Sequence, residues 1–392
     1  MIDIEKNKEN FKQAYEKYKE RIEIVPYPKD ELKKARQIDP LNLQQEPDEQ
    51  IIKQQRLKML KQKYEHTKRV VEKIETMNKI MNTNEFFKNL SMTAGLLHDY
   101  GRFIQAVYHN NYLDAENFYK ENGYNGHGEV GYKILFEQKE IRYFNIEEKY
   151  YKLLGPVVKY HQISKLQPEL DKRIDNNFNI IIDNDIKITE KYSEKDRILM
   201  SCMIQMVKDS DMFDILYQRI INEYPIFSQN FMWHVNNMTI EEISRNTNIS
   251  VEEIMEWNNI KSKNISNMKK IKLPFEKIDP KLLEVPQKIK EKFFNKVYLK
   301  DTKEWDLRTM QNDKTFNYNS ITAMWWTIGQ FLSSMNFTST LQMIKEENLL
   351  NKIYNLYPEK YKYLVKEMFE FAQVELLEKR INKEKIYAKK IK

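Results

Sequence analysis

Apolar residues recur every three or four positions along most of the chain, a spacing that predicts helices with one buried face. In the helix predicted over 86–97, for example, Ala94 and Leu97 lie three positions apart on the buried face. Short polar or proline-containing segments separate the predicted helices, which cover 5–22, 49–77, 86–97, 130–135, 151–161, 198–216, 321–332, 341–354 and 359–381. We therefore expect a predominantly helical protein with a substantial core.

Two stretches depart from this helical spacing. Residues 180–182 are β-like, and residues 231–275 follow the order strand, helix, turn, helix, strand. The fold class we predict is all-α, a helical bundle that carries a small α+β insert. The expected parts are an N-terminal extension interrupted by prolines, a core of helices, the insert, and C-terminal helices that complete the core, at 1–50, 51–230, 231–278 and 279–392.

The composition limits the kinds of partner and the cellular compartment that we expect for this protein. Of the 392 residues, 41% are hydrophobic and 31% charged, and no apolar stretch reaches the roughly 18 residues that suggest a membrane span. The single cysteine, Cys202, excludes an intrachain disulfide and favours a reducing cytoplasm, as does the charged N-terminus. The formal charge of +7 is modest and concentrated in the C-terminal tail, so we expect no membrane partner and no dedicated nucleic-acid surface.

The helix over 86–97 ends in the sequence Leu-Leu-His-Asp-Tyr-Gly-Arg, which contains His98, Asp99 and Arg102. A carboxylate at the end of a buried helix is costly unless a cation meets it, and a metal ion is one candidate. The alternative is a buried histidine and a helix-end aspartate that backbone groups satisfy. Seven of the eight glycines fall between residues 95 and 155, around this pair, where they permit close approaches.

Four of the six histidines lie in or at the ends of apolar helices within one span of the chain, together with aspartates. The polar residues embedded in this way are His66, His98, Asp99, His127, His161 and Asp209. Imidazole and carboxylate ligands suit Mn, Fe, Co, Ni or Zn, and also Mg where water completes the shell. Six such ligands suit two divalent ions bridged by one carboxylate, an arrangement that clamps a phosphate.

The pattern H…HD…H…H…D resembles the HD-domain metal-dependent phosphohydrolases over roughly residues 55–220. The segments that carry the resemblance are His-Thr-Lys-Arg-Val-Val, Leu-Leu-His-Asp-Tyr-Gly-Arg-Phe, Gly-His-Gly-Glu-Val-Gly and Lys-Asp-Ser-Asp, which begin at 66, 96, 126 and 208. The resemblance implies a first metal held by His66, His98, Asp99 and Asp209. It implies that Asp99 bridges to a second metal held by His127 and His161.

Nearby polar residues have weaker assignments. Arg102 lies one helical turn after Asp99 and can reach a phosphate at the metals, although a plain surface arginine is the alternative. We expect Asp211 and Asp214 to be surface acids or acids that support a metal ligand.

Residues 231–278 resemble a LysM repeat, whose last strand ends here at Leu273-Pro274. The Gly-Asp-Thr usual near the start of such repeats is replaced by Asn237-Met238-Thr239. We therefore favour a spacer or protein-contact role over glycan binding, and we expect Trp233 and Trp257 to be core residues of the insert.

The predicted function is hydrolysis of a phosphomonoester or phosphodiester by a metal-activated water, with Asp99 and Arg102 as catalytic residues. Nucleotides and cyclic nucleotides are candidate substrates. The competing hypothesis is a non-catalytic protein in which the metals brace the helices and the LysM-like insert recruits a protein or glycan partner.

Overall fold

The residues that the computed structural model describes make up most of the chain. These are 2–25, 49–109, 126–161, 177–182, 186–187, 189–221, 230–235, 238–266, 270–274, 277–297, 319–335, 337–376 and 384–391, with positions 115, 118–119, 121, 123–124, 268, 304–305, 310 and 313. None of the helices in these ranges combines the length and the apolar character that crossing a membrane requires.

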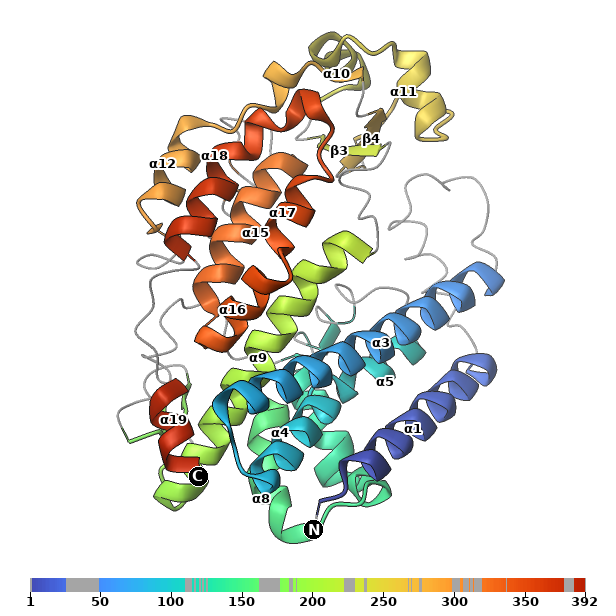
Figure 1. Ribbon diagram of the computed structural model, residues 1–392. Coiled ribbons are helices and arrows are strands. Elements are labelled where there is room, and N and C mark those ends of the chain that lie inside the picture. The colour runs from blue at the N-terminus through green and yellow to red at the C-terminus, as the bar shows by residue number, and fades with distance from the viewer. Residues whose placement is uncertain are drawn as a thin grey trace.

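The predicted all-α architecture is confirmed for the first half of the chain, where helices surround α4 (Figure 1). The helices of this group are α1 (Ile4–Ile24), α3 (Glu49–Met81), α4 (Glu85–Leu97), α5 (Tyr100–Tyr108), α7 (His127–Tyr132), α8 (Tyr151–Tyr160) and α9 (Glu194–Ile221). The short segments between α7 and α8 are η2 (Lys133–Glu137), η3 (Glu140–Tyr143) and η4 (Glu148–Tyr150).

Helix α4 brings the His-Asp pair into the centre of this group. Its N-terminus is capped by Asn84, whose side-chain oxygen accepts a hydrogen bond from Phe87 N at 2.9 Å. The helix ends at Leu97, and the following two residues cap the two helices that meet there: His98 is the C-cap of α4 and Asp99 the N-cap of α5. Both side chains are buried at this junction.

The N-terminal helix packs against the core. Helix α1 contacts α3, α4 and α5, and the ring of Phe11 lies 5.6 Å from that of Tyr64 and 5.2 Å from that of Phe103. The proline-interrupted segment predicted between α1 and α3 lies outside the described residues, apart from its two ends.

The second half of the chain adds a further group of helices, and α9 runs between the two groups (Figure 1). Helix α9 contacts α3, α4 and α8 of the first group and α15, α16, α17 and α19 of the second. The elements of the second group are η8 (Pro280–Leu283), α12 (Gln287–Phe294), α15 (Ser320–Ser334), α16 (Thr338–Glu346), α17 (Leu349–Tyr354), η9 (Glu359–Tyr361), α18 (Tyr363–Phe371), η10 (Ala372–Leu376) and α19 (Glu384–Ile391).

The helix predicted over 341–354 is two helices instead of one. Asn348 has a φ of 52°, in the left-handed region, which an α-helix cannot accommodate, so α16 ends before it and α17 begins after it. The pattern over 359–381 is likewise broken into η9, α18 and η10, and residues 377–383 lie outside the described residues.

The insert has the predicted order of elements. Strand β3 (Asn230–His234) pairs antiparallel with β4 (Lys270–Pro274), and between them lie α10 (Ile240–Thr247) and α11 (Val251–Trp257). Trp233 is buried as expected, whereas Trp257 is only half-buried. The β-like stretch near 180 also forms a strand, since β1 (Ile181–Ile182) pairs with β2 (Ile186–Lys187).

Candidate metal centre

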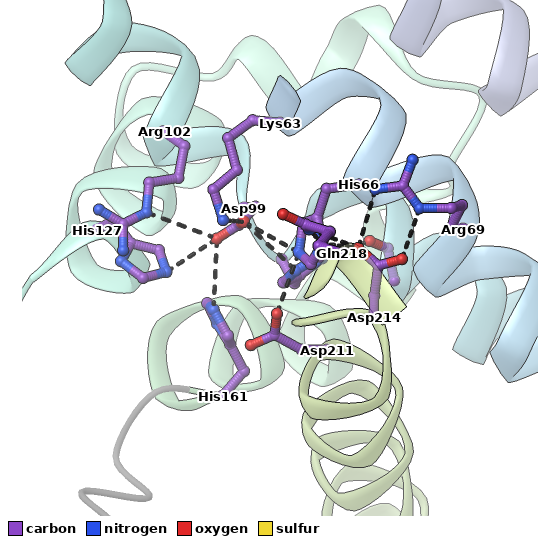
Figure 2. A network of polar contacts seen from close by, with 12 residues as sticks. Lys63, His66, Arg69, Asp99, Arg102, His127, His161, Asp211, Asp214 and Gln218 are labelled. Atoms are coloured by element: carbon purple, nitrogen blue, oxygen red, sulfur yellow. Dashed lines mark hydrogen bonds and ion pairs between the residues drawn. The ribbon is translucent and has the colours of Figure 1, made fainter. Parts of the chain in front are cut away.

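Asp99 lies where four helices bring histidines together (Figure 2). His66 comes from the middle of α3, His98 from the end of α4, His127 from the first position of α7 and His161 from the end of α8. The Nε2 atoms of His66, His98, His127 and His161 lie 3.5, 3.7, 2.9 and 3.9 Å from the nearest Asp99 carboxylate oxygen. The structure therefore brings these five predicted residues together.

Backbone carbonyl groups orient two of the imidazoles toward the centre. His98 Nδ1 donates a hydrogen bond to Gly95 O at 2.7 Å, and His161 Nδ1 donates one to Val158 O at 2.8 Å. Each bond leaves Nε2 as the nitrogen that faces Asp99 and that carries no proton in the neutral ring. Both Nε2 atoms are buried and have no hydrogen-bond partner among the described residues. A buried acceptor without a donor is costly, and a metal ion would satisfy it.

A carboxylate takes the same orienting role for His66. Asp214 on α9 lies with Oδ2 2.6 Å from His66 Nδ1, and Arg69 and Gln218 both donate hydrogen bonds to the same carboxylate. Figure 2 shows Asp214 on the far side of His66 from Asp99. Asp214 therefore fixes the ring of His66 and directs its Nε2 inward, as supporting carboxylates do for metal-bound histidines.

The structure corrects the prediction for Asp209. Its carboxylate points away from the centre, toward the start of α16, where Oδ2 accepts hydrogen bonds from Phe337 N at 2.8 Å and Thr340 Oγ1 at 3.3 Å. Asp211 faces the centre instead, with Oδ1 3.1 Å from His66 Nε2. Two positions along an α-helix rotate a side chain by about 200°, so Asp209 and Asp211 cannot share one face of α9.

The ligand-type atoms form two overlapping groups. One contains His66, His98 and Asp211, the other His98, Asp99 and His161, and within each group the candidate ligand atoms lie within 4.8 Å of one another. Nitrogen and carboxylate oxygen atoms at this spacing suit a divalent transition metal. The residues present therefore fit the metals that the sequence predicts.

Two cations flank Asp99. Arg102 Nε lies 4.0 Å from Oδ1, and Arg102 Nη1 also donates to Gln105 Oε1 at 2.8 Å. Lys63 Nζ donates to Oδ2 at 2.7 Å from α3. Lys63 was not predicted as a site residue, although its position three residues before His66 puts both on the same face of α3.

Burial and charge set the protonation of the centre. Burial raises the pKa of Asp99, but Lys63, His98 and His127 outweigh it and hold that pKa well below its ordinary value. Burial lowers the pKa of His98, and burial together with the neighbouring His98 and His127 lowers the pKa of His161 to about 3. Burial and Lys63 lower the pKa of His66, but its hydrogen bonds with Asp211 and Asp214 outweigh them and raise it. The ionised Asp99 next to neutral His98 and His161 is the protonation pattern that metal binding requires.

Comparison with known families adds two matches. The family model of the HD domain matches residues 64–195, and that of the LysM domain matches residues 239–274. The chain carries an HD domain and a LysM domain. Neither the curated proteins nor the solved structures include a significant match to the chain. The HD match contains His66, Asp99, His127 and His161 but ends before the aspartates of α9.

Close packing of three helices holds the HD domain's histidines around Asp99. A Cβ atom on Gly101 would lie 2.1 Å from His127 O and 2.7 Å from Gly131 N, so α5 approaches α7 through the absence of a side chain. A Cβ on Gly128 would likewise lie 2.8 Å from Lys159 O on α8. These contacts place the start of α7 against both Asp99 and the end of α8.

We expect Gly101→Ala to separate α5 from α7 and to move His127 away from Asp99. The added methyl group cannot be accommodated without a backbone shift, so the free energy of unfolding should fall by about 1–3 kcal/mol or more. Denaturant unfolding and elemental analysis of the same preparation measure both effects. Unchanged unfolding and unchanged metal content would show that the helices are not this tightly packed.

Proposed function

We propose that this protein is a metal-dependent phosphohydrolase of the HD superfamily that hydrolyses a phosphomonoester or phosphodiester. The observation that carries the proposal is the set of buried Nε2 atoms around Asp99 and Asp211, of which those of His98 and His161 have no hydrogen-bond partner among the described residues. Such a site favours binding of a cation and, through it, of an anionic substrate. Nucleotides and cyclic nucleotides are the substrates we would test first.

The proposed ligand set follows the geometry around α9. One ion would be held by His66, His98, Asp99 and Asp211, and a second by Asp99, His127 and His161, with Asp99 as the bridge. The short contact between Asp211 and His66 supports Asp211 in place of Asp209. Both ions would come from the set Mn, Fe, Mg, Co, Ni and Zn.

Each residue of the centre has a distinct role in the proposed reaction. Two divalent ions bound there would act as Lewis acids and lower the pKa of a coordinated water. Lys63 and Arg102, which flank Asp99, would contact the non-bridging oxygens of the phosphate and offset the charge that develops on them. Asp214 would keep His66 in position through its contact with Nδ1. The mechanism needs no covalent intermediate with the protein.

Lys63→Met should reduce kcat/KM for a phosphate ester by about 10- to 100-fold, the loss expected when one charged hydrogen bond to the phosphate is removed. The two-metal content should remain close to that of the wild type, because lysine is not a ligand in this proposal. Lys68→Met, on an exposed position of the same helix, is the control and should be unaffected. Steady-state kinetics with elemental analysis separate a substrate contact from a loss of metal, and a wild-type kcat/KM in Lys63→Met would exclude the contact.

Two measurements test the function itself. Elemental analysis of the purified protein should give about two transition-metal equivalents. Bis(4-nitrophenyl) phosphate and 4-nitrophenyl phosphate, each supplied with manganese, should release nitrophenol. Absence of bound metal, with both esters intact across the divalent ions named above, would overturn the proposal.

The LysM match supports a second candidate, a metal-braced scaffold that recruits a protein or glycan partner. The elements of the LysM domain are distant from Asp99 in the sequence and include a two-stranded sheet of their own, β3 with β4 (Figure 1). Deletion of residues 231–278 distinguishes the candidates. Ester hydrolysis that persists in the deleted protein assigns catalysis to the HD domain, whereas a scaffold would show no hydrolysis in either form.

A further inference from the structure

A cavity apart from the metal centre lies along α8. It has a volume of about 390 Å³, within the range of about 300–1,000 Å³ typical of small-molecule sites. The buried face of α8 is formed by Leu153, Leu154, Val157 and Val158, and the opposite face lines the cavity. None of the residues that surround Asp99 contributes to its lining.

Aromatic rings form the walls of this cavity. Tyr132 and Phe136 lie one turn apart with their rings stacked at 5.3 Å, and Tyr151 meets Phe136 edge-on at 5.9 Å. All three rings are half-buried. Gly155 forms part of the floor, and a Cβ atom there would lie only 3.0 Å from the ring of Tyr132, so the absence of a side chain leaves the ring accessible. Partly exposed rings such as that of Tyr151 suit a planar aromatic ligand.

Lysines supply the charge of the cavity. Lys152, Lys159 and Lys191 line it, and none of the described lining residues is acidic. Lys159 lies over the ring of Tyr132 at 5.2 Å and also 3.6 Å from Glu129, while Lys152 pairs with Asp196 at 2.8 Å. Lys191 is exposed and forms no ion pair with a carboxylate of the described residues. A positive rim beside aromatic walls favours a ligand that is both planar and anionic.

We infer that this cavity binds a nucleoside monophosphate, with the base against Tyr151 and the phosphate at Lys159 and Lys191. Stacking on the rings would supply affinity without strong base preference, and the lysines would select the anion. The site is separate from the metal centre and does not depend on the proposed hydrolysis. Its occupant would nevertheless contact α7 and α8, the helices that carry His127 and His161.

Isothermal titration of EDTA-treated protein with AMP tests this site without any contribution from metals. We expect saturable binding of AMP, weaker binding of adenosine and of inorganic phosphate, and a Kd at least about tenfold higher in the Lys159→Met/Lys191→Ala double variant. Tyr151→Leu should weaken AMP more than inorganic phosphate. Lys195→Ala, an exposed lysine on the first turn of α9 outside the lining, is the matched control and should bind AMP as the wild type does.

Three results would overturn the inference. They are the absence of saturable AMP binding to the metal-free protein, an unchanged Kd in the double variant, and inorganic phosphate that binds as tightly as AMP. None of them bears on hydrolysis at Asp99, because the titration contains no metal and no reaction is followed. Circular dichroism of each variant confirms that it is folded.

Discussion

Asp99→Asn should lower the turnover of a phosphate ester by about a thousandfold or more and reduce the bound metal below one equivalent per chain. Asparagine has the shape of aspartate, so the packing around the junction of α4 and α5 is kept while the negative charge is lost. Lys63 and Arg102 would then remain beside a neutral group, and their charge would oppose a metal ion. Elemental analysis and nitrophenyl ester hydrolysis measure the two effects.

The pH profile sharpens this prediction. The pKa of Asp99 is held well below its ordinary value, so the wild-type carboxylate is ionised throughout the neutral range and its loss cannot be compensated by raising the pH. The deficit of Asp99→Asn should therefore be constant between about pH 6 and 9. A variant with wild-type activity and two metal equivalents would exclude Asp99 as the bridge.

Asp211→Ala and Asp209→Ala should affect different properties, metal binding and stability respectively, although the two residues are only two positions apart in one helix. Asp211→Ala should lose a metal equivalent and at least about a hundredfold in activity, since it removes an oxygen that faces His66. Asp209→Ala should keep its metal but unfold more easily by about 1–3 kcal/mol, because Phe337 N loses its buried acceptor.

Each variant serves as the control for the other. Denaturant unfolding of the metal-free proteins measures the structural cost, and elemental analysis of the loaded proteins measures ligand loss. If Asp209→Ala loses metal and Asp211→Ala retains it, the orientation of α9 described above is wrong.

The histidines of the centre were predictable because each interrupts an apolar helical pattern and because the chain has so few of them. Which face of α9 points toward Asp99 was not predictable. Its central residues, Met200 to Ser210, are buried on all sides between two groups of helices, so no polar stripe marks the face toward Asp99. Three aspartates lie within six residues of α9, and it is their tertiary contacts that distinguish them: Asp209 with the start of α16, and Asp211 and Asp214 with the two nitrogens of His66.

Other departures have equally local causes. The break at Asn348 depends on one residue in a left-handed conformation, a choice that asparagine permits but does not require. Lys63 was missed because a lysine on a charged helix is most often solvated, and its contact appears only when α3 packs beside Asp99. The helices were therefore predictable from the periodicity of apolar residues, whereas the contacts of single polar residues were not.

Because α9 contributes to both halves of the molecule, ligand binding and folding become thermodynamically linked along it. One face presents Asp211 to the centre and Asp214 to the outer nitrogen of His66, and the other anchors the start of α16 through Asp209. A cation that stabilises the position of Asp211 must also restrain the backbone of its neighbour. We therefore expect amide hydrogen exchange in α16 to slow after metal loading, although α16 contributes no proposed metal ligand.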